Sequence, residues 1–244
     1  MPLILNIETT THVCSAALSK DGQLVSLRED HEGRSHASLL SYFIEDILQQ
    51  EKLKVADLDA VSISKGPGSY TGLRIGVSTA KGLCYGAGLP LLAVPTLQAL
   101  TLGMLDGISK STHLPEFDDQ TRLVPMLDAR RMEVYSALLN RNLEFLREVQ
   151  AEVIDASSYQ DELDSHKMIF FGDGSSKCRE VIRHPNAFFL EGIEPSAKYM
   201  INLSEKRFRR RMFEDVAYFE PFYLKDFIAT KPRKNIIPRS SSGN

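Results

Sequence analysis

The sequence contains no tryptophan and only three cysteines among its 244 residues. Cys14, Cys84 and Cys178 are far apart, and no Cys-x-x-Cys pair or Cys/His cluster has the spacing of a zinc site. The six histidines are scattered, and no two of them stand four residues apart, as a helical metal-binding pair requires. These absences argue against a disulfide framework and against a resident metal, so we expect buried thiols in a reducing compartment.

Long hydrophobic runs and a strong net charge are also missing. No apolar run approaches the roughly 20 residues that span a membrane, and the N-terminus lacks the basic start of a signal peptide. We therefore expect a cytoplasmic protein with no membrane partner. The net charge of −3 does not indicate a general nucleic-acid binder, although residues 228–244 carry four basic side chains and no acidic one. That last segment has the composition of a disordered basic tail.

One stretch, residues 64–82, is more specific than any other. A short apolar run at 60–64 leads into a turn with Gly66 and Gly68, and the turn leads into a helix rich in small residues. The turn has the position of a phosphate-binding loop. Its Gly-x-Gly-x-x-x-Gly spacing is one residue off the dinucleotide fingerprint, however, and no Gly-Lys-Ser/Thr follows. The pattern therefore favours a structural turn over a phosphate loop.

Within this helix, Gly72, Gly76 and Ala80 follow one another at intervals of four residues and share one face. Glycine inside a helix costs roughly 0.5–1 kcal/mol relative to alanine, so two of them on one face indicate the close approach of another backbone. That backbone could belong to the chain's own sheet or to a helix of another chain. The spacing alone favours the chain's own sheet.

The expected elements of the first half are three strands, a helix, and then alternating strands and helices. Strands are expected at 3–7, 12–18, 23–29, 60–64 and 91–94, with helices starting near residues 35, 70 and 96. This is the order of the ribonuclease-H-like α/β fold that actin, sugar kinases and heat-shock chaperones share, and those proteins carry two such domains.

The second half starts the same plan again. Strands are expected at 122–127, 132–139, 143–149 and 168–171, with a short helix at 157–163. We therefore predict two ribonuclease-H-like domains, the second one reduced. The predicted limits are 1–108 for the first domain, 109–227 for the second and 228–244 for the tail. A helix is predicted from 197 to about 217.

Polar side chains after two strands are candidate sites. Glu8, Thr9 and Thr10 follow the first strand, where kinases of this superfamily place a phosphate-binding turn and an aspartate that organises Mg²⁺. The glutamate is one methylene longer and no glycine follows it, which predicts weak or absent nucleotide binding. Asp128 and Arg130 follow a later strand and could form an acid–base pair or, more simply, a structural ion pair.

The helix predicted from residue 197 carries a basic run at 206–211. Charge spread around a helix is most simply a solvated face. The alternative is a patch that contacts RNA phosphates, for which Lys206, Arg207 and Arg210 are the candidate residues.

Several of these stretches together resemble the bacterial TsaB (YeaZ) family. The resemblance covers about residues 1–225, densely in the first half and thinly in the second. Members of the family usually have Asp-Thr where this chain has Glu8-Thr9, so the chain departs from the family at the candidate nucleotide site. The matching stretches are 4–10 (ILNIETT), 66–83 (GPGSYTGLRIGVSTAKGL), 128–130 (DAR) with 133–135 (EVY), and 221–224 (PFYL).

The resemblance implies a function as well as a fold. TsaB is similar in fold to TsaD, the catalytic subunit that installs the threonylcarbamoyl group on the adenosine beside the anticodon of tRNAs that read ANN codons. TsaB acts as a non-catalytic partner of TsaD, and TsaE is the third, ATP-hydrolysing component. By this resemblance, ATP or ADP and metal belong to the partner subunits, tRNA is reached through the complex, and this chain has no catalytic residue, cofactor or metal of its own.

The resemblance also implies how the chain contacts its partners. In the family, helices of the first domain pair side by side, either in a homodimer or with TsaD. The predicted partner interface therefore consists of Gly72, Ile75, Gly76, Thr79, Ala80 and Leu83. The alternative is a free-standing enzyme, either an ATP-dependent transferase or a glycoprotease-like peptidase. No metal pair, nucleophile elbow or Cys–His signature in the sequence supports the peptidase.

Overall fold

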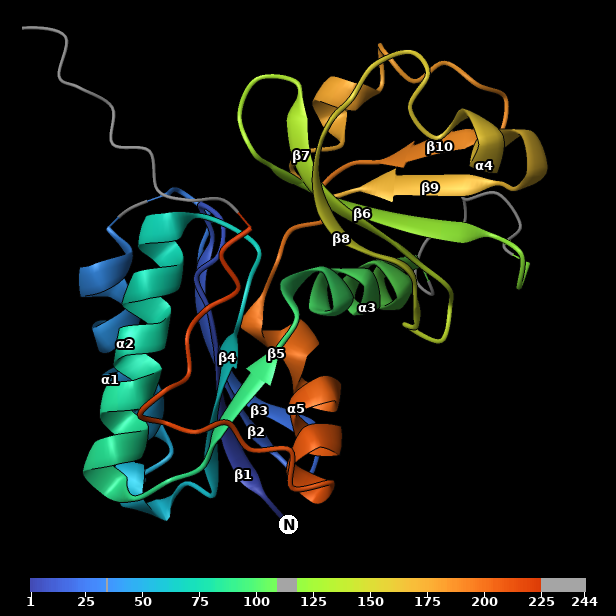
Figure 1. The fold of residues 1–244 in the computed structure, drawn as a ribbon. Helices are drawn as coiled ribbons and strands as arrows, with labels where there is room; N and C mark the ends of the chain where they lie inside the picture. The colour runs from blue at the N-terminus through green and yellow to red at the C-terminus, as the bar shows by residue number, and fades with distance from the viewer. Residues whose placement is uncertain (34, 109–117, 225–244) are drawn as a thin grey trace, which may run out of the picture.

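The computed structural model describes residues 1–33, 35–108 and 118–224. It contains two five-stranded sheets, one in each half of the chain, with helices packed on them (Figure 1). The predicted α/β class with two ribonuclease-H-like domains, the second reduced, is confirmed. Among the described residues, no helix combines the length and the apolar character needed to cross a membrane.

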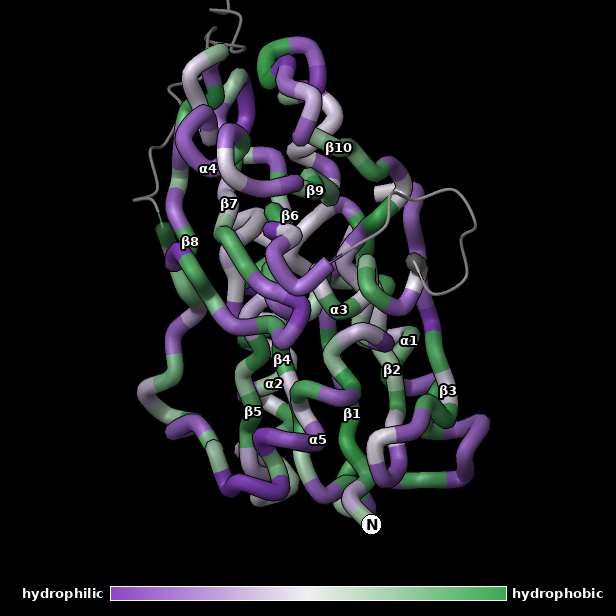
Figure 2. Tube along the Cα trace, turned by 90° about the vertical axis from the view of Figure 1, so that its right-hand side faces the viewer, coloured by the Kyte–Doolittle hydropathy of each residue, from purple (hydrophilic) through white to green (hydrophobic). Residues whose placement is uncertain are grey.

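The first domain starts with an antiparallel meander. It consists of β1 (Leu3–Glu8), β2 (Cys14–Lys20) and β3 (Gln23–Asp30), while β4 (Ala60–Ser64) and β5 (Leu91–Val94) continue from β1 in parallel. The strand order is β3-β2-β1-β4-β5. The central strand β1 is buried over most of its length, and Figure 2 shows it as mainly hydrophobic. The last residues of β1 therefore lie in the interior of the molecule.

Two helices cover one face of this sheet, α1 (His36–Gln50) and α2 (Tyr70–Ala87). The apolar stripe of α1 and the inner side of α2 share one core with the strands. α2 begins at Ser69, whose hydroxyl accepts a hydrogen bond from the Gly72 N–H, and it ends at Gly88, which has a left-handed conformation. Its limits thus follow from ordinary capping residues.

The second domain repeats the strand order of the first. β6 (Arg122–Asp128), β7 (Glu133–Leu139) and β8 (Phe145–Val153) form a meander, and β9 (Met168–Phe171) and β10 (Ala187–Leu190) continue from β6 in parallel. The strand β10 was not predicted from the sequence. The other elements are short: α4 (Gln160–Ser165), η2 (Ser176–Cys178) and, in the first domain, η1 (Val55–Asp57).

The helix α3 (Thr96–Ile108) lies between the two sheets (Figure 1). One side of it, with Leu100 and Met104, packs in a core with the strands of the second sheet. Its other side meets the C-terminal part of the chain, where the ring of Tyr199 fills the space beside Gly103. α3 therefore joins the two domains by packing against both.

The end of the described chain returns to the first domain, which corrects the predicted domain limits. The 3₁₀ turn η3 (Ala197–Met200) and α5 (Ile201–Arg209) pack on the face of the first sheet opposite α1 and α2. Phe208 there contacts a core formed by β1, β4 and β5. Residues 109–227 are therefore not one domain, because the first sheet needs a cover on its second face and the C-terminal segment supplies it.

The predicted helix from 197 to 217 was too long. α5 ends at Arg209, and Arg211 has a left-handed backbone conformation that stops the helix. The chain then turns along the edge of the first sheet, where the Glu214 N–H donates to the Leu91 carbonyl at 2.9 Å. This pairing to a strand far away in the sequence is what helical periodicity could not predict.

We refer to residues 210–224 as the C-terminal strap. Lys81 of α2 holds the strap in place, because its ammonium group donates to the carbonyl oxygens of Ala217 and Phe219 at 3.0 and 3.1 Å. The strap ends beside the glycine turn, where the Phe222 N–H donates to the Lys65 carbonyl. The predicted tail at 228–244 lies outside the described residues.

Candidate functional site

A pocket of about 740 Å³ lies between the two domains. The β1–β2 turn, the glycine turn with the start of α2, the β6–β7 turn and the end of the C-terminal strap all line it. The two sheets thus contribute corresponding turns, since β6–β7 is the second-domain counterpart of β1–β2. We refer to this space as the interdomain pocket.

The β1–β2 turn carries the candidate nucleotide residues. Glu8, Thr9 and Thr10 are at most 1 % exposed, and only Thr10 of the three lines the pocket. One oxygen of Glu8 accepts a hydrogen bond from the Thr10 N–H at 2.6 Å, and burial raises the pKa of the Glu8 carboxyl group. A carboxyl group sealed from the pocket does not offer the oxygen ligand that Mg²⁺ needs. The magnesium–nucleotide site implied by the fold superfamily therefore does not fit this turn.

The glycine turn packs directly on Thr10. The Ser69 N–H donates to the Thr10 carbonyl at 2.7 Å, and a Cβ on Gly68 would stand 2.6 Å from the Cβ of Thr10. Gly66 has a φ of +108°, a value that side chains disfavour. Close packing against Thr10 therefore explains why this turn contains glycine. The same contacts place the first turn of α2 in the wall of the pocket.

Across the pocket, the β6–β7 turn presents Asp128 and Arg130. Asp128 forms an ion pair with Lys177 and accepts a hydrogen bond from the Arg130 N–H at 3.2 Å. The expected Asp128–Arg130 ion pair is not formed in the described part of the chain: the ion-pair partner of Asp128 is Lys177. Beside them, burial raises the pKa of Asp173, whose carboxylate accepts a hydrogen bond from the Asp128 N–H.

Three histidines stand near the pocket, each held by a polar neighbour. His12 and His31 approach the two oxygens of Glu194, at 3.1 and 2.7 Å. His36 lies 2.8 Å from the carbonyl oxygen of Thr11. In the part of the chain that the structure describes, no group of three or more His, Cys, Asp or Glu side chains could hold a metal ion.

The glycine face of α2 points into the molecule, which corrects half of the predicted partner interface. A Cβ on Gly72 would overlap the carbonyl oxygen of Thr9, and one on Gly76 would stand 2.9 Å from Ile63. Ala80 is fully buried. The spacing showed correctly that these residues share a face, but what approaches them belongs to this chain: Thr9 of the β1–β2 turn and Ile63 of β4. They therefore cannot contact a partner.

The other predicted interface residues have a different position. Ile75, Thr79 and Leu83 are half-buried on the flanks of α2. Gly82 and Gly86 form a second pair of glycines on α2, which was not predicted as part of the interface. This pair faces outward, since a Cβ on either residue would meet nothing within 4 Å. The signal was present in the sequence, because these two glycines also stand four residues apart.

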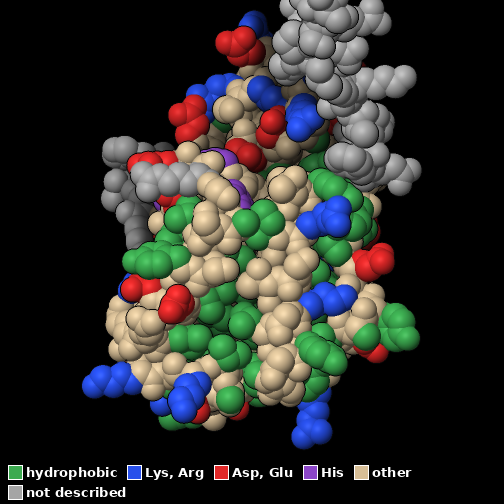
Figure 3. Space-filling model, turned by 90° about the vertical axis from the view of Figure 1, so that its left-hand side faces the viewer, with side chains coloured by type: hydrophobic (Ala, Val, Ile, Leu, Met, Phe, Trp, Pro, Cys, Tyr) green, Lys and Arg blue, Asp and Glu red, His purple; other side chains and the backbone are tan. Residues whose placement is uncertain are grey.

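The outer face of α1 and α2, which we call the helical face, is poor in charge. Tyr42 on α1 and Tyr85 on α2 are 59 % and 87 % exposed. Figure 3 shows this side of the molecule, with hydrophobic and uncharged surface in the centre and most Lys, Arg, Asp and Glu side chains towards the edges. Exposed apolar surface of this kind is typical of a protein-contact site.

The candidate RNA-contact residues lie on the opposite face of the first sheet, Lys206 and Arg207 on α5 and Arg210 directly after its end. Lys206 and Arg210 are exposed. Arg207 is half-buried, and burial lowers its pKa. Its Nε has no hydrogen-bond partner among the described residues, so Arg207 contributes to the packing of α5. Arg209 binds Glu205 and Asp21 and is therefore already engaged.

Comparison with known proteins covers nearly the whole chain. The TsaB proteins of Escherichia coli (strain K12) and Haemophilus influenzae, named for tRNA threonylcarbamoyladenosine biosynthesis, are 28 % and 27 % identical to it over 235 and 237 residues. These alignments cover 93 % of this chain in both cases, and 96 % and 95 % of the relatives. A family model described as TsaD, tRNA N6-adenosine threonylcarbamoyltransferase, matches residues 30–232. The chain belongs to the TsaB (YeaZ) family.

A solved structure supports the fold independently. YeaZ from Pseudomonas aeruginosa superimposes with a TM-score of 0.76 at 24 % identity, covering 92 % of this chain and 100 % of the other. The TsaB fold of this chain thus extends through both sheets and the returning C-terminal segment. The family resemblance predicted from residues 4–10 and 66–83 is confirmed.

Proposed function

We propose that this TsaB-family chain is a non-catalytic scaffold subunit for threonylcarbamoylation of the adenosine beside the anticodon in tRNAs that read ANN codons. The observation that carries the proposal is the similarity, over 93 % of the chain, to proteins named for the biosynthesis of this modified adenosine. The partners are a TsaD-like catalytic subunit and a TsaE-like ATPase. The match to the TsaD model supports the same tRNA-modification process.

The burial of Glu8 at the end of β1 supports a non-catalytic role. The only carboxyl group at the end of β1, that of Glu8, is buried and bonded to the Thr10 backbone. A general base must reach the proton it abstracts, and a metal-binding carboxylate must reach the metal. Glu8 satisfies neither requirement, so the reaction falls to the partner that supplies metal and nucleotide.

The helical face is the proposed partner surface. Of the interface residues predicted from the sequence, Ile75, Thr79 and Leu83 are kept. Gly82 and Tyr85 are added, in place of the inward-facing glycines. The stripe without side chains at Gly82 and Gly86 lets a second helix approach α2 closely, with Tyr42 and Tyr85 as flanking contact area. We propose that this surface binds the TsaD-like subunit and that, without that subunit, two copies of this chain pair through it.

The basic end of α5 is a separate proposed contact, with tRNA held in the complex. Lys206 and Arg210 are exposed and no ion pair neutralises them among the described residues. Such side chains bind phosphates through charge, with a strong dependence on salt. Arg207 is excluded from this contact, since its guanidinium is partly buried.

The competing hypothesis is a free-standing enzyme, either an ATP-dependent transferase or a peptidase. Titration of the purified chain with Mg-ATP, together with metal analysis, separates the two. The scaffold proposal expects no stoichiometric metal, no micromolar affinity for Mg-ATP, and co-purification with a TsaD-like subunit. A bound metal or turnover of ATP by the isolated chain would favour the enzyme instead.

A further inference from the structure

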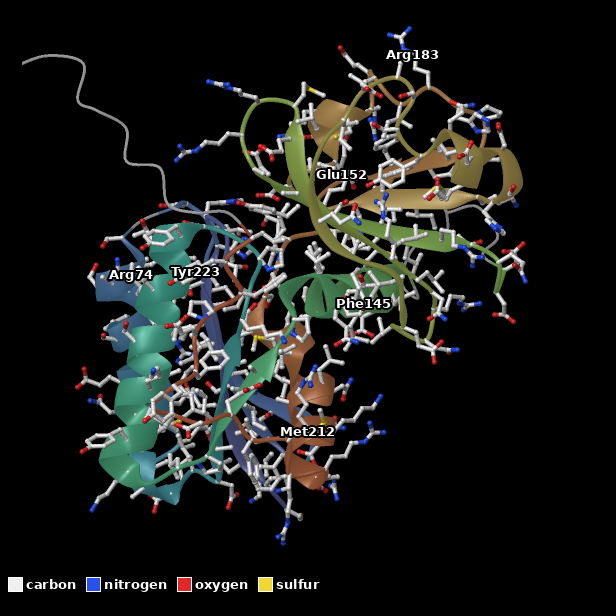
Figure 4. The ribbon with its side chains drawn as sticks, viewed as in Figure 1. Arg74, Phe145, Glu152, Arg183, Met212 and Tyr223 are labelled. Atoms are coloured by element: carbon white, nitrogen blue, oxygen red, sulfur yellow. The ribbon has the colours of Figure 1, made fainter. Side chains whose placement is uncertain are left out.

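Exposed cations and exposed apolar side chains stand side by side where α5 ends. Lys206, Arg210 and Arg211 are exposed. Met212 and Phe213 follow them directly, and these two residues are 48 % and 42 % exposed. Figure 4 labels Met212 beside α5. We refer to these five residues as the α5-end patch. Its apolar part takes no role in the charge contact proposed above, so phosphate binding alone does not explain the patch.

The ring of Phe213 is fixed in place although it is exposed. Its edge meets the ring of Phe208, with the centroids 5.7 Å apart and the planes at 66°. Phe208 in turn packs against the core formed by β1, β4 and β5. The next residue, Glu214, is held by the hydrogen bond from its N–H to the Leu91 carbonyl. An exposed ring that is anchored in this way is a preformed surface on which a flat group can stack.

Arg211 keeps its charge in the patch at a cost in backbone energy. It follows the C-cap residue Arg210 and has a φ of +54°, the left-handed conformation that glycine adopts most easily. A residue with a side chain is disfavoured there. Backbone strain of this kind is found preferentially at functional sites, so an arginine in place of glycine points to a use for its charge.

The three cations of the patch are free to bind an anion. Their side chains form no ion pair or hydrogen bond within the described ranges. Arg209, by contrast, is already bound to Glu205 and Asp21. The carboxylate of Asp215, in the C-terminal strap, accepts hydrogen bonds from two backbone N–H groups. Three unpaired cations so close together in the chain suit the repeated phosphates of a nucleic acid.

Basic and apolar side chains together also occur on proteins that bind a membrane surface, but the apolar area here is too small for that. The apolar side chains of α5 itself pack inward, since Leu203 and Phe208 lie against residues of the first sheet. Only Met212 and Phe213 are left at the surface, whereas a helix that lies in a membrane surface buries a whole apolar face. A nucleic acid needs only charge for its phosphates and a ring for its base.

We propose that the α5-end patch binds an unpaired stretch of RNA, with one base stacked on Phe213 and the flanking phosphates held by Lys206, Arg210 and Arg211. Unpaired bases can be splayed out and stacked on an aromatic side chain, whereas the bases of a duplex are stacked on one another. The patch therefore prefers single-stranded to double-stranded RNA. This inference rests on the proposed contact between α5 and tRNA, and it names the part of the RNA that the contact takes.

The test measures binding of the full chain by fluorescence anisotropy at several salt concentrations. The RNA probes are a single-stranded oligouridylate of sixteen residues and a duplex of eight base pairs, which have similar numbers of phosphates. Vesicles of anionic phospholipid are the third probe. Phe213→Leu removes the ring but keeps an apolar side chain, and Phe213→Tyr keeps the ring. Arg211→Gly removes the strained cation, and Arg183→Gly makes the same change at an exposed arginine of the second domain. A thermal melt of each variant verifies that it is folded.

We expect the oligouridylate to bind more tightly than the duplex. Phe213→Leu should weaken binding of the single strand about fivefold or more and leave the duplex unchanged, while Phe213→Tyr should bind like the unchanged chain. Arg211→Gly should raise the melting temperature, because glycine fits the left-handed conformation, and should nevertheless weaken RNA binding and flatten its dependence on salt. Arg183→Gly should leave RNA binding unchanged.

Tighter binding of the duplex, no effect of Phe213→Leu, or saturable binding to the vesicles but not to RNA would overturn the proposal. The basic residues at 228–244 are present in every variant, so differences between variants report the α5-end patch alone. The outcome is also separable from the proposed function. If charge changes weakened RNA binding and Phe213→Leu did not, the charge contact with tRNA would stand and only this inference would fail.

Discussion

Thr9 and Gly72 are locked together across the first domain: the Thr9 hydroxyl donates to the Gly72 carbonyl at 2.8 Å, and the Thr9 carbonyl occupies the place of a Gly72 side chain. The same residue fills the space beside Gly76. The β1–β2 turn and helix α2 therefore approach at backbone distance at Gly72. This contact explains why glycine stands at both positions, and it places the glycine face in the chain's own core.

Stability should respond oppositely to changes on the two faces of α2. Gly76→Leu would force a side chain against Thr9 and Ile63, and overpacking of this kind costs about 1–3 kcal/mol or more. Gly82→Ala places its Cβ in open space, and the better helix propensity of alanine should stabilise the chain by about 0.5–1 kcal/mol. Urea unfolding of both variants measures the difference. If Gly76→Leu melted like the unchanged protein, the inward position of this face would be wrong.

Association should depend on the helical face and not on other exposed apolar side chains. Tyr85→Asp introduces a charge at a residue that is 87 % exposed, so the fold should tolerate it while a second helix should not. Val153→Asp, at a 69 % exposed residue of the second domain, is the control. Size-exclusion chromatography with light scattering, alone and with a TsaD-like subunit, should show lost association only for Tyr85→Asp. Equal behaviour of the two variants would remove the helical face as the partner surface.

The burial of Glu8 predicts a particular pH dependence of stability. Because the pKa of Glu8 is raised above its ordinary value in the folded chain, the folded state holds a proton that the unfolded state releases. Its contribution to the free energy of unfolding therefore falls as the pH rises from about 4.5 through the folded pKa. Glu8→Gln should flatten this decline, and Glu45→Gln, on the outer side of α1, should not. Urea unfolding between pH 5 and 8 measures the slopes; parallel curves for all three proteins would contradict the assignment.

Glu8→Gln also tests the absence of catalysis from this subunit. If Glu8 only packs and hydrogen-bonds, modification of tRNA by the complete complex should fall slightly at most, because glutamine keeps the size and the acceptor for the Thr10 N–H. A loss of two orders of magnitude or more with the complex intact would show that Glu8 performs acid–base or metal chemistry.

Charge reversal on α5 should weaken tRNA binding by the complex. Lys206→Glu with Arg210→Glu removes two exposed cations, which should lower the affinity and flatten its dependence on salt by about one unit of slope for each lost phosphate contact. Arg183→Glu is the control, since this exposed arginine lies at the far end of the second domain (Figure 4). Filter binding at several salt concentrations gives both slopes. Unchanged binding would show that Lys206 and Arg210 only form a solvated surface and do not contact tRNA.

The succession of strands and helices in the first domain, and of the first four strands in the second, could be predicted because it depends on local signals. Alternation in 23–29, the apolar run at 60–64 and the turn at Asp21-Gly22 each act over a few residues. Asp21 and Gly22 both have positive φ, as the two-residue turn between β2 and β3 requires, and the cap at Ser69 marks the start of α2. Where the contacts that determine an element lie nearby in the sequence, the residue pattern was sufficient to predict that element.

The errors share a cause, which is that the deciding contact lies far away in the sequence. The orientation of the glycine face depends on Thr9, 63 residues before Gly72. The end of α5 and the place of the C-terminal strap depend on Leu91 and Lys81, more than a hundred residues earlier. The interdomain pocket was not predicted at all, since its walls come from three separate turns and the end of the C-terminal strap. Spacing can show that residues share a face, but not what that face meets.

The central claim, that this chain is a required non-catalytic subunit, is tested most directly by an omission experiment. TsaD-like and TsaE-like proteins are incubated with tRNA, threonine, bicarbonate, ATP and the enzyme that supplies the activated threonylcarbamoyl group, with and without this chain. Mass spectrometry of the digested tRNA then measures the modified adenosine. We predict modification that saturates as this chain reaches the amount of the TsaD-like subunit, and little or none without it. Equal modification in its absence, or modification by this chain without the TsaD-like subunit, would contradict the account.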